Sequence, residues 1–142
     1  MNYNQDITFI NIKEVSKFDI EKTTKVKTLE MEHKIPCWGY RIKYENKLIV
    51  LITDTLASSQ AVKLAKDADI LIHEATYEYN QNIKAQNHYH TTNLQAMEIA
   101  DQSNVGRLIL THFSQTISDE QLNKWVWNGK PCVIYNEKQF IS

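Results

Sequence analysis

The chain has 142 residues, 16 of them Lys or Arg and 17 Asp or Glu. This length suffices for one domain with a real core, and the near-neutral balance argues against a uniformly basic, nucleic-acid-binding surface. The first 47 residues hold eight Lys and one Arg, but acidic residues are mixed among them, so a solvated mixed-charge surface is favoured there. No signal peptide or membrane-length apolar run is visible, and a cytoplasmic protein that does not engage a membrane is expected.

The N-terminal part of the sequence predicts antiparallel strands. Residues 7–12 alternate loosely, and residues 24–31 alternate more clearly. Residues 38–44 place Trp38 and Tyr40 on one face and form the clearest half-buried strand. Residues 48–53 are almost continuously apolar, as in a strand covered on both faces.

The C-terminal part predicts alternating helices and strands. Capping boxes at Thr92 and Ser118 mark two helix starts, and Leu94 and Met97 are expected to face inward. The expected order is helix 58–68, strand 70–73, helix 92–103, strand 107–111, helix 118–127 and strand 132–135. The fold class is therefore α/β (α+β).

Polar side chains follow several of these strands directly. Asp54, Glu74 and His112 each come after an apolar run, and His33 follows the strand at 24–31. Ligands in open α/β sheets bind at the carboxyl ends of strands. Carboxylates and imidazoles together suit a hard or borderline metal ion, so the pattern predicts a metal-dependent hydrolase.

Six motifs in order resemble the ribonuclease Z branch of the metallo-β-lactamase superfamily. They are Glu32-His33-Lys-Ile-Pro36, Gly39-Tyr-Arg41, Thr53-Asp54-Thr55, His73-Glu-Ala-Thr76, His90-Thr-Thr92 and Leu110-Thr-His-Phe-Ser114. The resemblance implies an αββα sandwich with a two-metal site, usually zinc.

The resemblance also implies roles for individual residues. His33 and His112 would each bind one metal ion, and Asp54 would bridge both. His90 would be the catalytic histidine, which assists the leaving group, and Glu74 would orient and polarise it. A carboxylate beside an imidazole fixes its tautomer and raises its basicity, which supports this pairing.

The family's principal ligand motif, HxHxDH, is absent from the sequence. Residues 1–142 are therefore expected to be the C-terminal half of the metallo-β-lactamase-fold domain, because three protein ligands cannot complete two tetrahedral sites. The expected partner is an N-terminal half that carries HxHxDH, and a homodimer is the alternative. The isolated chain is expected to be inactive.

The resemblance implies phosphodiester hydrolysis, with the 3′ side of precursor tRNA as substrate. Two alternatives remain open: a hydrolase of the same fold that acts on small phosphodiesters or esters, and a non-catalytic half-domain that pairs with a partner. Only 20 residues separate His33 from Asp54, which leaves room for a hairpin but not for the long tRNA-gripping arm of many ribonuclease Z enzymes.

Overall fold

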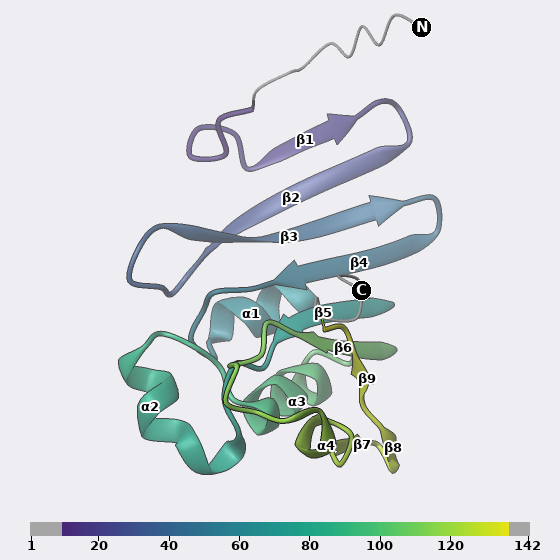
Figure 1. Ribbon diagram of the computed structural model, residues 1–142. Helices are drawn as coiled ribbons and strands as arrows, with labels where there is room; N and C mark the ends of the chain where they lie inside the picture. Colours follow the sequence, from purple (N-terminus) through teal and green to yellow (C-terminus); the bar gives the residue numbers. More distant parts are fainter. Residues whose placement is uncertain (1–9, 137–142) are drawn as a thin grey trace, which may run out of the picture.

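A mixed seven-stranded sheet is the main element of the computed structural model, which describes residues 10–136 (Figure 1). The strand order is β1-β2-β3-β4-β5-β6-β9. Neighbours from β1 to β4 are antiparallel, and neighbours from β4 to β9 are parallel. The strands are β1 (Lys17–Ile20), β2 (Thr24–Met31), β3 (Cys37–Tyr44), β4 (Lys47–Ile52), β5 (Ile70–Glu74), β6 (Arg107–Thr111) and β9 (Val133–Ile134).

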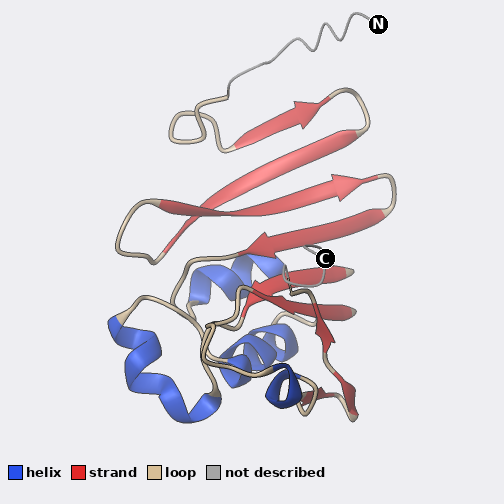
Figure 2. Cartoon of the chain, viewed as in Figure 1, coloured by secondary structure: helices blue, strands red, loops and turns tan. Residues whose placement is uncertain are grey.

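Helices cover one face of this sheet (Figure 2). Helix α1 (Ser59–Ala65) packs on β2, β3 and β4, and α3 (Asn93–Gln102) packs on β5 and β6. The Ser58 and Thr92 side chains accept hydrogen bonds from the backbone N–H groups three residues on, which caps the two helices. The remaining elements are 3-10 helix η1 (Tyr79–Gln81), α2 (Asn82–Asn87), α4 (Asp119–Leu122) and the two-stranded pair β7 (Val126–Trp127) and β8 (Lys130–Pro131).

The core lies between the sheet and these helices. Val50, Ile52, Leu71 and Leu110 are fully buried there against the helices. Gly39 lies under α1, where a Cβ atom would come within 2.6 Å of the Leu64 Cδ2 atom. The glycine therefore sets how closely α1 approaches β3.

The opposite face of the sheet carries a continuous band of half-buried apolar side chains, which we call the open face. Because cross-strand partners point to the same side, the register places these residues together on the side away from α1 and α3. They are Trp38, Tyr40, Ile42, Ile49, Leu51, Ile70, Ile72 and Ile109.

The α/β (α+β) fold class is confirmed, with strands 24–31 and 107–111 as predicted. The expected strand at 7–12 is wrong for residues 10–12, which form a loop and turn, and residues 7–9 lie outside the described range. Leu94 is exposed and not inward-facing.

The helix predicted for residues 118–127 ends at Leu122. Asn128 and Gly129 both have positive φ, and their turn joins β7 to β8 in a hairpin, so Val126 and Trp127 lie in a strand and not at the end of the predicted helix. Among residues 10–136, no helix is long and apolar enough to cross a membrane.

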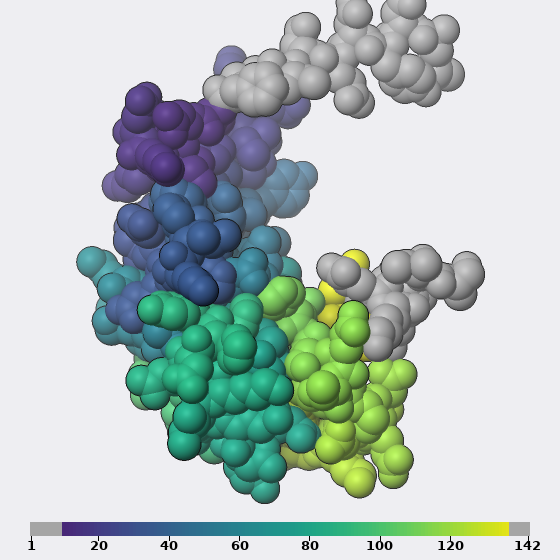
Figure 3. Space-filling view, turned by 60° about the vertical axis from the view of Figure 1, so that its left-hand side comes forward, coloured from purple at the N-terminus to yellow at the C-terminus, as the bar shows by residue number. Residues whose placement is uncertain are grey.

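The strands β1 to β3 extend beyond the helical layer. In Figure 3 the N-terminal strands, purple to blue, stand clear of the teal and green part that contains the helices. Both faces of these strands are therefore accessible over part of their length.

Candidate metal centre

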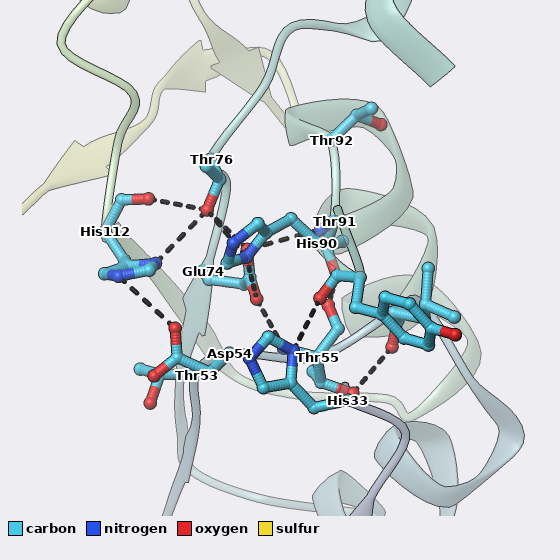
Figure 4. A network of polar contacts seen from close by, with 12 residues as sticks. His33, Thr53, Asp54, Thr55, Glu74, Thr76, His90, Thr91, Thr92 and His112 are labelled. Carbon is cyan, nitrogen blue, oxygen red and sulfur yellow. Dashed lines mark hydrogen bonds and ion pairs between the residues drawn. The ribbon is translucent and has the colours of Figure 1, made fainter. Parts of the chain in front are cut away.

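Loops at the carboxyl ends of parallel strands bring the candidate residues together (Figure 4). Asp54 follows β4 with φ 52°, and His112 follows β6 with φ 59°. Left-handed backbone is uncommon for residues other than glycine, and such strain gathers at functional sites. These two turns aim the Asp54 carboxylate and the His112 imidazole at each other, with His112 Nε2 3.4 Å from Asp54 Oδ1.

His90 completes a group of three donors. One ligand atom from each of Asp54, His90 and His112 lies within 4.8 Å of the others. The rings of His90 and His112 are 5.5 Å apart between centroids. Asp54 and His112 remain nearly half exposed, with 43% and 46% of their side-chain surface accessible. The group is therefore open to solvent on one side.

Glu74 lies directly behind His90 and is fully buried. Its Oε2 atom is 3.0 Å from His90 Nδ1, and its Oε1 atom is 3.2 Å from the same nitrogen. The Thr55 and Thr91 backbone N–H groups and the Thr76 hydroxyl also donate to this carboxylate. A buried carboxylate is costly without partners, and here every side of it is satisfied.

These contacts shift both pKa values of the pair. Burial acts to raise the pKa of Glu74, but hydrogen bonds from His90, Thr76 and the Thr55 backbone outweigh it and hold the pKa below its usual value. The hydrogen bond to Glu74 raises the pKa of His90, although partial burial opposes this. The pair therefore favours a carboxylate beside an imidazolium, with His90 Nδ1–H donating to Glu74.

Thr76 links the same carboxylate to His112. Its Oγ1 atom lies 2.5 Å from Glu74 Oε2 and 3.2 Å from His112 Nδ1. When the hydroxyl proton is donated to the carboxylate, the oxygen accepts from His112 Nδ1–H. This arrangement leaves the Nε2 lone pair of His112 facing Asp54, so Glu74 orients both imidazoles.

His33 lies next to His90 at this edge of the sheet (Figure 4). Its ring centroid is 5.6 Å from that of His90, and its Nδ1 atom is 3.1 Å from the Tyr89 carbonyl oxygen. A donated Nδ1 proton leaves Nε2 free to bind a metal ion. His33 is nevertheless outside the close set of three donors.

The sequence predicted His33, Asp54 and His112 as ligands and His90 and Glu74 as catalytic residues. The structure brings all five to one edge of the sheet, but the roles themselves stay predictions. His90 lies as close to Asp54 and His112 as a ligand would.

The sequence did not reveal how Thr55, Thr76 and Thr91 serve Glu74. A buried carboxylate needs several hydrogen-bond donors, so the sequence could have predicted that neighbours of Glu74 donate to it. Which neighbours supply the donors depends on the loop geometry.

The donors present fit a divalent ion of the zinc type. One carboxylate and two imidazoles match the hard-to-borderline donors that Zn²⁺ takes. Three donors, or four with His33, do not fill two tetrahedral sites, so a pair of ions requires further ligands.

The sequence comparisons identify the family. The model of the family described as "Beta-lactamase superfamily domain" matches residues 2–113. The chain belongs to this superfamily. Within it, Ribonuclease Z of Streptococcus pyogenes serotype M5 (strain Manfredo) is 49% identical over 70 residues, which cover 49% of this chain and 23% of that protein. The chain is therefore ribonuclease Z-like, as its motifs indicated.

Solved structures agree on the metallo-β-lactamase fold. The short form of human tRNase Z is 36% identical with a TM-score of 0.62, and the match covers 72% of this chain and 41% of that one. The metallo-β-lactamase fold protein YhfI from Bacillus subtilis is similar in fold, with a TM-score of 0.74 at 23% identity over 84% of this chain and 48% of that one. The chain spans less than half the length of each of these relatives.

Proposed function

We propose that this chain supplies the second half of the active site of a metal-dependent phosphodiesterase of the ribonuclease Z type. Its substrate is the 3′ side of precursor tRNA. The observation that carries the proposal is the buried Glu74–His90 pair directly beside Asp54 and His112. A polarised imidazole next to a cluster of metal-binding donors can combine general acid catalysis with metal-ion catalysis, and both accelerate phosphodiester hydrolysis.

Each residue has a distinct task in this proposal. Asp54, His33 and His112 would hold the divalent ions, with Asp54 as the ligand shared between two ions and each histidine serving one of them. When bound, the ions supply Lewis acidity that polarises the phosphoryl group and lowers the pKa of water. As water attacks phosphorus and the P–O bond to the leaving alcohol breaks, His90, whose pKa is raised by Glu74, donates its Nε2 proton to the departing oxygen. Glu74 keeps the ring in this tautomer and orientation.

The remaining ligands come from a polypeptide segment that carries HxHxDH, whether joined to this chain or separate from it. The open face supports this part of the proposal, because it offers an apolar band across the four strands β3 to β6 on the side that the helices leave uncovered. Burying each large side chain of the band contributes about 1.5–3 kcal/mol.

The short β3–β4 hairpin favours a second candidate, a hydrolase of small phosphodiesters. Nothing between His33 and Asp54 extends beyond the two strands and their tight turn. Relative rates on a precursor tRNA and on bis(p-nitrophenyl) phosphate distinguish the candidates. The tRNA proposal requires a much higher kcat/KM on the tRNA.

The test of the proposed mechanism uses the chain combined with an HxHxDH polypeptide. We expect His90→Ala to retain both metal ions and to lose roughly 10²–10⁴-fold in turnover, the range for a positioned acid. Glu74→Gln should show a smaller loss in the same direction. His88→Ala is the matched control, because this exposed histidine lies in the same segment without a contact to Glu74.

Metal content and hydrolysis must be measured on the same preparations. Turnover that is unchanged in His90→Ala would contradict the role of this residue as the acid. Metal that is lost in step with activity would instead make His90 a ligand, in line with its place in the group of three donors.

A further inference from the structure

A groove of about 470 Å³ crosses the protruding part of the sheet, on the same face as α1. Strand register puts five cationic side chains on this face, and we call them the cationic face. They are Lys17, Lys25, Lys27, Arg41 and Lys43. Asp19 is the one carboxylate among the residues that line the groove.

These cations face one another across the strands. Lys25 is the register partner of Lys43, and Lys27 is the partner of both Arg41 and Lys17. Like charges directly opposite each other destabilise a sheet. Between residues 10 and 136 the structure gives none of these side chains an ion-pair partner, so the repulsion is not offset locally.

Ordinary structural roles explain only part of the cationic face. Arg41 donates to the Leu64 and Lys66 carbonyl oxygens, at 2.7 and 2.8 Å, and so caps the end of α1. Lysines on edge strands discourage unwanted strand pairing, which accounts for Lys17 on β1. Lys25 and Lys43 lie on the interior strands β2 and β3, where no edge needs protection.

We propose that the cationic face binds the phosphate backbone of an RNA substrate at a distance from the scissile bond. The proposal rests on the proposed function for the choice of RNA among polyanions. Its physical basis is the groove itself, which gathers fixed positive charges that a phosphate chain would neutralise with release of counterions. The sequence had favoured a mixed-charge surface here, but the pleat turns Glu30 to the opposite face, and Asp19 is the acidic residue that lines the groove.

The groove is remote from the candidate metal centre. Lys43 pairs with Leu48, six residues before Asp54, and this corresponds to roughly 20 Å along β4. At about 3.4 Å of helical rise per nucleotide, that is about six nucleotides. The groove would therefore raise affinity for a long substrate without acting on the reacting phosphate.

Fluorescence anisotropy of a labelled 20-nucleotide RNA with the full chain in EDTA tests the proposal. Lys25→Gln/Lys43→Gln should weaken binding about 25-fold at 0.1 M salt and lower the salt slope by about 1.4, since each phosphate contact contributes about 0.7 to the slope. Lys124→Gln/Lys130→Gln is the matched control, with the same charge change on exposed lysines outside the groove. It should change affinity less than twofold.

Equal losses in the two double variants would show that only net charge matters and would overturn the proposal, as would unchanged affinity in the groove variant. Displacement of the RNA by polyglutamate at equal charge concentration would overturn it in favour of an acidic protein partner. Because the assay contains no metal ion, it tests RNA binding alone. RNA binding by the groove, together with no hydrolysis when metal ions and an HxHxDH polypeptide are supplied, refutes only the proposed function. Hydrolysis of a small phosphodiester without RNA binding refutes only the groove.

Lys43→Glu separates binding from folding. The glutamate would lie opposite Lys25, so an attraction between unlike charges would replace the repulsion between two lysines. The urea midpoint of unfolding should therefore rise while the affinity for RNA falls. A fall in both quantities would show that Lys43 serves the sheet and would overturn the proposal.

Discussion

Replacing Glu74 by Gln should destabilise the folded chain far more than its small change in shape suggests. The carboxylate accepts from Thr55 N–H through Oε1, at 2.6 Å, and from Thr91 N–H through Oε2, at 3.2 Å. A glutamine has one acceptor oxygen, so either orientation turns its NH₂ group towards one of these buried donors. An unsatisfied buried group costs about 1–3 kcal/mol, and the charge-assisted bond to His90 weakens as well.

The expected loss is about 3 kcal/mol. At a urea dependence of about 2 kcal/mol/M, this lowers the unfolding midpoint by about 1–2 M. Tryptophan fluorescence at one fixed protein concentration measures it. Glu98→Gln on the exposed surface of α3 is the control and should stay within about 0.5 kcal/mol. A midpoint for Glu74→Gln equal to that of the unaltered chain would refute the hydrogen-bond reasoning.

The same pair predicts the pH dependence of stability. The lowered pKa of Glu74 contributes stability above the unfolded value of 4.5, and this is lost as the pH falls through the folded pKa. The raised pKa of His90 contributes stability below the unfolded value of 6.5, and this is lost as the pH rises through the folded pKa. The difference between Glu74→Gln and the unaltered chain should therefore be largest between pH 4.5 and 6.5. A difference that grows steadily above pH 7 would contradict the pairing.

Three further variants or conditions probe the fold. Gly39→Ala should lower the free energy of unfolding by about 1–3 kcal/mol, because the new methyl group forces the buried Leu64 side chain away from β3. The urea midpoint measures this loss, and an unchanged midpoint would mean that α1 can move freely. Thr92→Ala should cost about 1 kcal/mol, because it removes the cap on the Gln95 N–H, and Thr116→Ala in a loop is a control for the lost hydroxyl. The open face should make the chain dimerise or bind a hydrophobic dye on its own, and a monomer with a sharp melt and no dye binding in light scattering and fluorescence would argue against this prediction.

Local pattern was enough to predict most of the sheet. Alternation in 24–31 indicates a half-buried strand, and the apolar runs in 48–53 and 107–111 favour buried strands because they are too short for typical helices and rich in β-branched residues. The prediction failed for residues 123–127, because the Asn128-Gly129 turn, which depends on positive φ, pairs Val126 and Trp127 with β8 in a hairpin.

The candidate residues could be named from the sequence, but their geometry could not. Position after a strand predicts that Asp54 and His112 share an edge, yet their contact depends on two left-handed turns. The role of Thr76 between Glu74 and His112 is a tertiary contact without any local signal. Likewise, the cationic face follows from strand register, which composition does not reveal.

Zinc titration by calorimetry tests the central claim most directly, with and without a polypeptide that carries HxHxDH. We predict weak zinc binding by the chain alone and much tighter binding with the polypeptide. Asp54→Asn should lose that gain, whereas the exposed control Asp67→Asn should keep it. Equal zinc affinity with and without the polypeptide, or full metal retention by Asp54→Asn in the combined form, would contradict the ligand assignment and with it the proposed function.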